Sequence, residues 1–425
     1  MNTPSFDGDC MRKTFYAKAM RRISETAEWA ATLVRIPSES PFSDTTSVSV
    51  AARDIIADFP ATYVEEYTLE EPVRNLVAYC KGQGPGLGKR IVFSGHLDTY
   101  PAGDHQFWTA DPFSGSIVDG KLFGRGAADM KGGIAAAMAA LKLMAEHRDL
   151  WSGEIVLALA GDEETMGERG SKFLLDTVPR CSGDCVICPD VGAASVLRFG
   201  EKGLHWISLE ARGKASHGAH VHKGHNAIDR LLLAVSRIKD ELAELPVHAP
   251  DIVIRSILDA ARVSEPLAGN GESEVLRKVT VNIGEIGGGT SPNLVPDKAW
   301  ATLDIRIPVG LDVLDVERRI KEITDSVEGV SHKVLRSYPA NWSDPGGKIF
   351  ACLKWAASVV HGTEVVTNMR VGASDARLFR LYKNIPSANC GLTPYNLGAP
   401  DEYASVREIG ELSAILALAS LDFLC

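Results

Sequence analysis

Short apolar runs alternate with a helix-like segment in the first half of the chain. Three runs predict strands: Ile91 to Ser94, Glu154 to Ala160 and Val186 to Cys188. Between the first two, an alanine-rich stretch from about Gly133 to His147 predicts a helix. Strands that alternate with helices are typical of an α/β domain whose mostly parallel sheet is flanked by helices. Ligands bind beyond the carboxyl ends of such strands, so we expect the functional site there.

The pattern changes from about His205 onwards. Further segments predict three strands and one long amphipathic helix: Trp206 to Ala211, Lys278 to Ile286, Ala299 to Pro308 and, for the helix, Asn226 to Leu245. They indicate a small α+β unit inserted into the larger domain. The 425 residues also exceed the roughly 250–300 at which a single core stops growing. We therefore predict a catalytic domain of residues 1–204 and 319–425, and an inserted domain of residues 205–318.

Composition narrows the functional class. The formal net charge of −10 argues against a nucleic-acid-binding protein, because phosphate contacts need a basic surface. No apolar run is long enough to cross a membrane, and residues 1–25 lack the apolar core of a signal peptide. The 8 cysteines are too sparse for a disulfide scaffold, which favours a reducing cytoplasm. Buried thiols are favoured over zinc ligation for Cys181, Cys185 and Cys188, because no fourth ligand follows at zinc-site spacing.

Acidic and imidazole groups follow the ends of the predicted strands: His96, Asp98, Glu163, Glu164 and Asp190. Several strands thus deliver such groups to one sheet edge, which is a pattern that builds sites. Residues two apart on a strand face the same side, so Asp98 can support the imidazole of His96. A metal-bound histidine usually donates its other N–H to such an acceptor. Alone, the His-x-Asp pair is weak evidence for a metal site.

Two further acidic features add to this pattern. The side chains of Glu163 and Glu164 leave a strand in different directions, so one can bind a metal while the other takes a proton from a bound water. A solvated acidic turn is the commoner origin of such a pair. Asp129 lies in the glycine-rich stretch Gly124 to Gly133, whose glycines permit an unusual backbone path. An aspartate there is either a metal ligand or a helix N-cap.

The order and context of these motifs resemble those of the M20 metallohydrolases, a family that includes acetylornithine deacetylase, succinyl-diaminopimelate desuccinylase, aminoacylase and carboxypeptidase G. The resemblance extends over nearly the whole chain from about Thr32. It rests on the following stretches: Gly95 to Asp104, Asp111-Pro112-Phe113, Asp119 to Leu122, Gly124-Arg125-Gly126, Asp129 to Gly133, Asp162-Glu163-Glu164, Gly213 to His217, Asn226-Ala227-Ile228, Asn293 to Pro296, Asp304-Ile305-Arg306 and Asp375-Ala376-Arg377.

The resemblance implies an α/β catalytic domain with an inserted dimerisation or lid domain. It also implies a metal centre. His96 and Asp190 would bind one divalent metal ion, and Asp129 would bridge to a second ion that Glu164 also binds. Such an ion lowers the pKa of a bound water, which then attacks an electrophilic carbon.

The other implied roles concern proton transfer and the substrate. Glu163 would be the general base, which later returns the proton to the departing nitrogen, and Asp98 would orient the metal-bound histidine. His217 would reach the active site of a neighbouring subunit and polarise the substrate carbonyl, so a homodimer or larger homo-oligomer is expected. Asn293 and Arg377 would bind the substrate, with the arginine holding a carboxylate.

One ligand position departs from the family pattern. The family ends with a histidine before Pro-Asn/Asp-Glu-Tyr, whereas this chain has Gly398 before Ala399-Pro400-Asp401-Glu402-Tyr403, and no histidine follows His361. The lost ligand serves the second metal. We therefore predict one catalytic Mn²⁺ or Zn²⁺ per subunit, with Glu164 as an open case and these ligands: His96, Asp129 and Asp190.

A changed metal centre invites a changed reaction. The favoured hypothesis is a metal-dependent hydrolase that cleaves the amide bond of an N-acyl amino acid or a similar small carboxylate. The alternative is an aminohydrolase that releases ammonia from an aromatic amine carboxylate, like the M20-related 5-nitroanthranilate aminohydrolase. A non-catalytic binding protein on this fold is a third hypothesis. It is disfavoured because the base Glu163 is retained.

Overall fold

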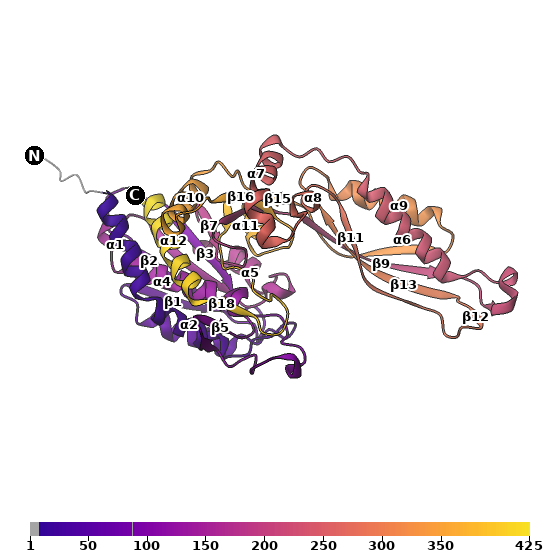
Figure 1. Ribbon diagram of the computed structural model, residues 1–425, viewed down its shortest axis with the longest axis horizontal. Coiled ribbons are helices and arrows are strands. Elements are labelled where there is room, and N and C mark those ends of the chain that lie inside the picture. Colours follow the sequence, from indigo (N-terminus) through magenta and orange to yellow (C-terminus); the bar gives the residue numbers. More distant parts are fainter. Residues whose placement is uncertain (1–7, 87) are drawn as a thin grey trace, which may run out of the picture.

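A computed structural model describes residues 8–86 and 88–425. It has a large α/β domain and a long arm that projects from one side of it (Figure 1). The expected α/β sheet flanked by helices and the expected α+β insertion are both present.

The large sheet has the strand order β1-β2-β6-β3-β7-β17-β8-β15, with β16 paired to β8. Its central strands β6, β3, β7 and β17 run parallel, whereas β1, β2 and β15 pair antiparallel at its sides, so the sheet is mixed where a mostly parallel one was expected. The bounds are β1 (Thr62–Tyr67), β2 (Asn75–Lys81), β3 (Arg90–His96), β6 (Glu154–Ala160), β7 (Cys185–Cys188), β8 (Val196–Glu201), β15 (Asn341–Trp342), β16 (Val366–Arg370) and β17 (Ser387–Asn389).

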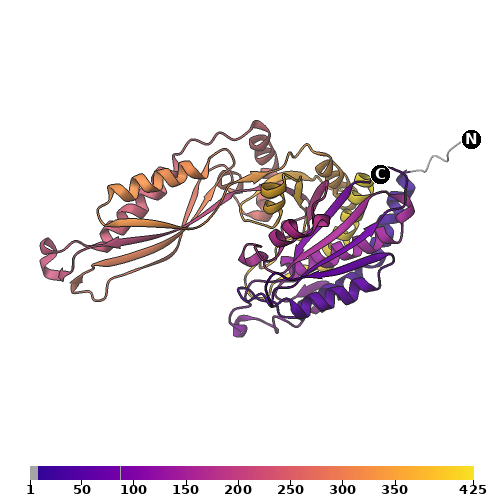
Figure 2. The ribbon, with the colours of Figure 1, turned by 180° about the vertical axis from the view of Figure 1, so that it is seen from behind.

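Helices cover both faces of this sheet (Figures 1 and 2). Successive strand residues point to opposite faces. Ile91 and Phe93 therefore pack in one core with α2, α4, α10 and α12, while Val92 packs in a second core with α5 and α11. The helix bounds are α1 (Gly8–Arg21), α2 (Ile23–Val34), α3 (Thr46–Ala57), α4 (Gly132–Ala145), α5 (Ser171–Thr177), α10 (Lys348–His361), α11 (Ala376–Lys383) and α12 (Val406–Leu424).

The apolar C-terminal segment is a packed helix. Helix α12 lies against α4 and α10, and its apolar residues are buried from Ile409 to Leu424. Within the described part of the chain, no helix combines the length and apolarity needed to cross a membrane.

The arm is a four-stranded antiparallel sheet covered by two helices. Its strand order is β11-β13-β9-β14, and the apolar residues of the strands pack against α6 and α9. A short strand pair, β10 with β12, lies at the far tip of the arm (Figure 1). The bounds are β9 (Gly203–Arg212), β10 (Ser216–His217), β11 (Thr280–Gly288), β12 (Leu294–Val295), β13 (Lys298–Ile307), β14 (Val330–Tyr338), α6 (Ala227–Ala243) and α9 (Val313–Ser326).

The topology favours domain boundaries different from those expected. Strand β14 lies beyond the expected boundary at residue 318, yet it pairs along β9 in the arm sheet. Helix α7 (Asp251–Ala268) lies inside the expected insertion but packs on β16 of the large sheet. We therefore propose that the arm comprises residues 203–250 and 280–338, and that α7 and α8 (Glu272–Val275) belong with the large domain.

Candidate metal centre and active site

Neighbouring strands of the large sheet bring the predicted site residues together. Strands β6, β3 and β7 lie side by side, and parallel strands end at the same sheet edge. His96 is the last residue of β3, Glu163 lies just beyond β6, and Asp190 lies just beyond β7. The carboxyl ends of three strands thus place an imidazole and two carboxylates at one edge.

A first group of possible metal ligands consists of His96, Asp129 and Asp190. Ligand atoms of all three lie within 4.8 Å of one another, and all three residues are buried. His96 Nε2 is 3.1 Å from Asp129 Oδ1. Buried imidazole and carboxylate oxygens are the ligands that Zn²⁺ and Mn²⁺ accept, so this donor set fits a divalent metal ion.

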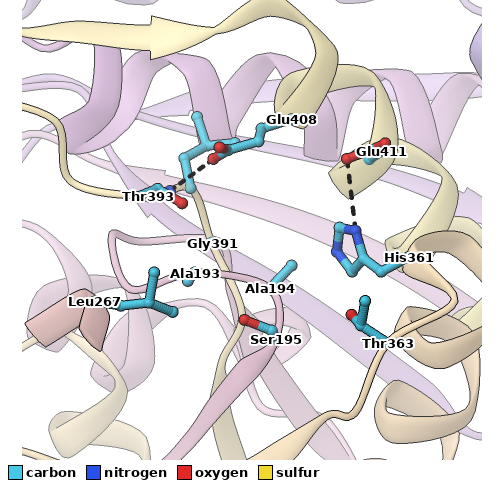
Figure 3. A pocket seen from close by; sticks show the side chains of 11 residues that line it. Ala193, Ala194, Ser195, Leu267, His361, Thr363, Gly391, Thr393, Glu408 and Glu411 are labelled. Atoms are coloured by element: carbon cyan, nitrogen blue, oxygen red, sulfur yellow. Dashed lines mark hydrogen bonds and ion pairs between the residues drawn. The ribbon is translucent and has the colours of Figure 1, made fainter. Parts of the chain in front are cut away.

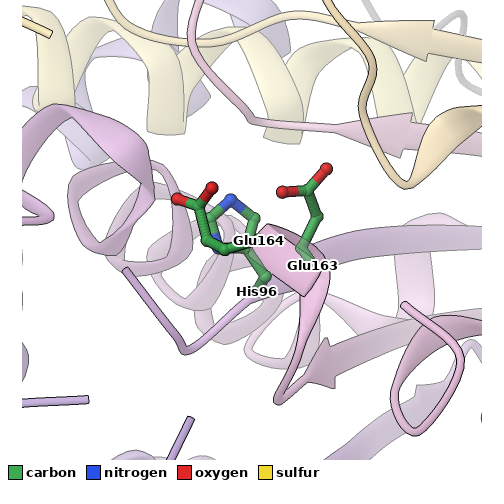
Figure 4. A group of neighbouring side chains, drawn as sticks. All are labelled: His96, Glu163 and Glu164. Carbon is green, nitrogen blue, oxygen red and sulfur yellow. The ribbon is translucent and has the colours of Figure 1, made fainter. Parts of the chain in front are cut away.

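A second group shares the same histidine. Ligand atoms of His96, Glu163 and Glu164 also lie within 4.8 Å of one another. In Figure 4 the two carboxylates stand on either side of the imidazole. Burial raises the pKa of Glu163 well above its ordinary value, and burial together with the charges of Asp129 and Glu163 raises that of Glu164 to about 11. For Glu164, the part of the shift that comes from the neighbouring carboxylates is one that a bound cation would relieve.

Asp98 has a wider role than the expected support of His96. The imidazole Nδ1 lies 3.0 Å from the backbone carbonyl oxygen of Asp98 and 3.6 Å from its carboxylate. A proton on Nδ1 leaves Nε2 free to bind a metal. The carboxylate of Asp98 accepts hydrogen bonds from the backbone N–H groups of Glu163, at 3.0 Å, and Glu164, at 3.1 Å. It therefore holds the turn that carries the proposed base.

Glu402 positions Asp129, a role that the sequence did not reveal. Its carboxylate accepts hydrogen bonds from the backbone N–H groups of Ala128 at 3.0 Å and Asp129 at 3.2 Å. Arg125 pairs with the other oxygen at 2.5 Å. Strand β18 (Tyr403–Ser405) pairs with β5 (Lys121–Phe123), which brings these distant segments side by side. The motif that contains Glu402 was recognised, but its partner could be found only from this pairing.

Arg370 is a second residue that sequence reasoning missed. It is the last residue of β16, and its Nη1 lies 2.6 Å from Asp190 Oδ2. Burial opposes its charge, but Asp190, Glu201 and Asp129 raise its pKa above the ordinary value. The residues before it, Val366-Thr367-Asn368-Met369, include two polar side chains, so the strand-end rule gave no clear signal for Arg370.

Arg377 occupies a different environment from the one expected. It is 1% exposed, and its two Nη atoms donate to the backbone oxygens of Ser374, at 2.8 Å, and Met166, at 2.7 Å. Its Nη1 also lies 3.8 Å from Glu163 Oε1. The carboxylate-binding role remains a prediction. The observed contacts favour a role in positioning Glu163.

His217 and Asn293 lie together at the tip of the arm, away from the metal centre of the same chain (Figure 1). His217 is exposed, and the N–H of Gly218 donates to the backbone oxygen of Asn293 at 2.6 Å. One chain therefore does not bring these two predicted residues to His96.

Gly398 supplies no ligand at the position where the family pattern has a histidine. Its φ is +72°, and a Cβ atom there would meet nothing within 4 Å. Its carbonyl accepts a hydrogen bond from Arg125 Nη2 at 3.2 Å. Among the described residues, both candidate ligand groups depend on the same imidazole, that of His96.

Other polar features do not belong to this centre. A pocket of about 210 Å³ lies beside the loop that follows Asp190 (Figure 3). Its carboxylates already have partners, since Glu411 pairs with His361 at 3.5 Å and Glu408 accepts from the N–H of Thr393 at 2.9 Å. None of the predicted site residues lines it.

The cysteine triplet considered for zinc is buried. Burial raises the pKa of the thiols of Cys181, Cys185 and Cys188, which disfavours the thiolate form that binds zinc. Neither candidate metal group in the described part of the chain includes a cysteine. The thiols therefore act as small apolar core residues.

Comparison with known proteins gives a consistent result. Residues 92–422 match the family described as Peptidase family M20/M25/M40. Succinyl-diaminopimelate desuccinylase of Rhodospirillum centenum is 28% identical over 354 residues, or 81% of this chain and 83% of that protein. A probable succinyl-diaminopimelate desuccinylase of Staphylococcus aureus is 32% identical over 299 residues, or 68% of this chain and 72% of that protein. The crystal structure of human carnosine dipeptidase 1 has a TM-score of 0.75 at 18% identity, covering 97% of this chain and 99% of that one.

Proposed function

Since this chain belongs to peptidase family M20/M25/M40 and is a metallohydrolase that acts on carbon–nitrogen bonds, we propose that it hydrolyses the amide bond of a small N-acyl amino acid. One observation carries the proposal. Glu163 stands beside a buried His96–Asp129–Asp190 donor set that fits a divalent metal ion. The relatives named as desuccinylases support an acyl group that itself bears a carboxylate.

Different residues bind the metal ion and transfer the proton. A divalent metal ion held by His96, Asp129 and Asp190 would supply Lewis acidity and lower the pKa of a water molecule. Glu163 takes a proton from that water while the water oxygen adds to the substrate carbonyl carbon. The carbon–nitrogen bond then breaks, and Glu163 returns the proton to the nitrogen. Burial raises the pKa of Glu163 above its ordinary value, and a bound cation would offset part of that rise.

We infer one Mn²⁺ or Zn²⁺ ion per subunit, because Gly398 replaces the expected ligand and both ligand groups share His96. Elemental analysis of active, dialysed enzyme tests this stoichiometry. A value near one metal ion per chain is expected, and two tightly held ions would contradict it.

We further propose a cytoplasmic homodimer. Exposed His217 and Asn293 at the arm tip support this assembly, because they have the residue types to contact a substrate but lie far from the metal centre of their own chain. In the dimer, the tip of one arm completes the site of its partner, and His217 polarises the substrate carbonyl there.

A product assay tests the reaction. Enzyme reconstituted with Mn²⁺ or Zn²⁺ is incubated with N-succinyl and N-acetyl amino acids and, in parallel, with 2-aminobenzoates. Release of a carboxylic acid and a free amino acid supports the proposal. Release of ammonia from the aminobenzoates would instead establish the aminohydrolase reaction, which the comparisons do not favour. Binding without turnover of either class would indicate the non-catalytic alternative.

A further inference from the structure

The proposed substrates carry a carboxylate, and the site that receives them is rich in carboxylates of its own. Asp98, Asp129, Glu163 and Asp190 are buried around His96. An anionic substrate is repelled from such a site unless fixed positive charge opposes the carboxylates. A metal ion supplies part of that charge, and a side-chain cation that faces the substrate would supply the rest.

The two residues expected to recognise the substrate do not provide this cation within one chain. Arg377 is 1% exposed, and its Nη atoms already donate to backbone carbonyls. Asn293 is uncharged and lies at the tip of the arm. Within one chain, an accessible cation close to the metal centre is therefore the better candidate to recognise a carboxylate.

Arg370 has the geometry for this task. Its Nη1 donates to Asp190 Oδ2 at 2.6 Å and lies 3.4 Å from the carbonyl oxygen of Val191. Its Nε and Nη2 make no hydrogen bond to any described residue. Neither of these two atoms is fully shielded from solvent. The side chain is 17% exposed. One edge of the guanidinium is thus anchored on a metal ligand, while the other edge is free and accessible.

An arginine held in this way is suited to bind a carboxylate. A guanidinium stays charged in proteins and donates two parallel hydrogen bonds to a carboxylate. Anchoring by Asp190 orients the plane of the group before the substrate arrives, which reduces the entropy lost on binding. Because the anchor is itself a candidate metal ligand, the bound carboxylate would lie near the reacting carbonyl.

Arg336 is the rival candidate near the site. Its Nη1 lies 3.3 Å from the carbonyl oxygen of Thr165, and its guanidinium lies 5.7 Å from the ring centre of Trp206. It comes from β14 of the arm and makes no ion pair with a candidate metal ligand among the described residues. It is therefore less closely coupled to the metal centre.

We propose that Arg370 is the specificity-determining residue of the site, and that the free edge of its guanidinium binds the carboxylate of the substrate. The choice of a carboxylate-bearing substrate rests on the proposed function. The contact between Arg370 and Asp190 does not.

The first test measures binding without turnover. Metal-loaded Glu163→Gln enzyme is titrated with N-acetylglycine and with its neutral amide, N-acetylglycinamide, in the Arg370 and Arg370→Met backgrounds. The Arg370 background should prefer the acid, and the substitution should weaken acid binding about 30-fold while changing amide binding little. Equal acid binding in both backgrounds, or no acid binding in the first, would overturn the proposal.

Two further variants make the result specific. Arg370→Lys keeps the charge but loses the forked donor geometry, so it should bind the acid more weakly than arginine and more tightly than methionine. Arg336→Met should leave the preference for the acid in place, and loss of that preference in Arg336→Met alone would assign the role to Arg336 instead. Metal content measured on each sample shows whether an effect arises from metal loss.

Activity then separates this inference from the proposed function. On N-acyl amino acids, Arg370→Met should raise KM more than it lowers kcat. If the unsubstituted enzyme hydrolyses no N-acyl amino acid, the proposed function fails, while the binding measurements still decide whether Arg370 recognises carboxylates.

Discussion

At the scale of single residues, neighbouring groups hold Glu163 in position. Arg377 lies 3.8 Å from its carboxylate, and the Asp98 carboxylate holds its backbone N–H at 3.0 Å. The side chain is therefore oriented before any substrate binds. Pre-orientation of a proton-transfer group is a large part of what general acid–base catalysis requires.

We expect Glu163→Gln to lower kcat by about 10³-fold, because the amide is nearly isosteric but cannot accept the proton. Steady-state kinetics on a confirmed N-acyl amino acid measures the loss. Metal content should stay at the level of the unsubstituted enzyme. Unchanged turnover would show that another residue is the base.

The backbone next to Asp190 packs closely against the start of helix α4. A Cβ atom on Gly133, in the first turn of α4, would lie 2.0 Å from the carbonyl oxygen of Pro189. We therefore expect Gly133→Ala to displace the end of β7, destabilising the protein by about 1–3 kcal/mol. The affinity of the protein for the metal ion should also fall, because Asp190 follows the end of β7.

Denaturant unfolding and metal titration measure the two effects. Gly192→Ala is the matched control, because a Cβ atom there meets nothing within 4 Å although the residue lies in the loop just after Asp190. Equal stability of the two alanine variants would contradict the steric argument.

The positions of site residues could be predicted where they follow from strand order. His96, Glu163 and Asp190 were found because parallel strands end at one edge of a sheet. Arg370 and Glu402 were not assigned, because their roles depend on partners far away in the sequence. Such pairings exist only after the sheets have formed.

At the scale of elements, Lys202 joins two of the four places where the chain passes between the large domain and the arm. It lies between β8 and β9. Its Nζ donates to the carbonyl oxygens of Val275, at 2.8 Å, and Lys278, at 2.7 Å, and to Thr280 Oγ1 at 3.1 Å. These acceptors lie on the segment that leads into β11. The buried amine of Lys202 therefore connects two of the segments that link the large domain and the arm.

Burial lowers the pKa of Lys202 to about 7 in the folded protein, whereas an unfolded lysine keeps its proton up to about 10.4. Above pH 7 the folded state therefore binds fewer protons than the unfolded state, so this group adds stability as the pH rises. Below pH 7 both states are protonated, and its contribution does not change with pH.

The unfolding free energies of the unsubstituted protein and Lys202→Met, measured by denaturant titration from pH 6 to 9, test this sign. The difference should shift in favour of the lysine protein above about pH 7. A difference that is flat, or that shifts the other way, would contradict the assigned pKa.

Most elements were predictable because their apolar periodicity is strong. The strand expected at Glu154 to Ala160 is β6 with the same bounds, and the helix expected from about Gly133 to His147 is α4 (Gly132–Ala145). Strand β14 was not predicted, because five of its nine residues are exposed and it has little apolar pattern. It is recognised only by its pairing with β9.

At the scale of the whole molecule, the length of the arm separates the predicted substrate residues from the metal centre. His217 and Asn293 are at one end and His96 is in the large domain (Figure 1). If a partner subunit supplies the tip, two different inactive variants can complement each other.

We expect mixtures of inactive His217→Ala and Glu163→Gln subunits to regain about a quarter of full activity after co-refolding in equal amounts, since half the dimers are mixed and each has one intact site. Activity assays on the mixture and on each parent measure the gain. No recovery in mixtures shown by mass spectrometry to contain mixed dimers would contradict a shared site.

Asp98 contacts both His96 and the turn that carries Glu163, and this constrains how the enzyme can evolve. Its backbone carbonyl contacts the imidazole of His96, a candidate metal ligand, and its carboxylate accepts hydrogen bonds from the backbone N–H groups of Glu163 and Glu164. A mutation there that frees the acid–base turn also risks rotating the histidine. We therefore expect metal affinity and proton transfer to change together at Asp98, whereas Arg370, which contacts Asp190, and Gly398, which contacts Arg125, are positions where a change of reaction can begin more easily.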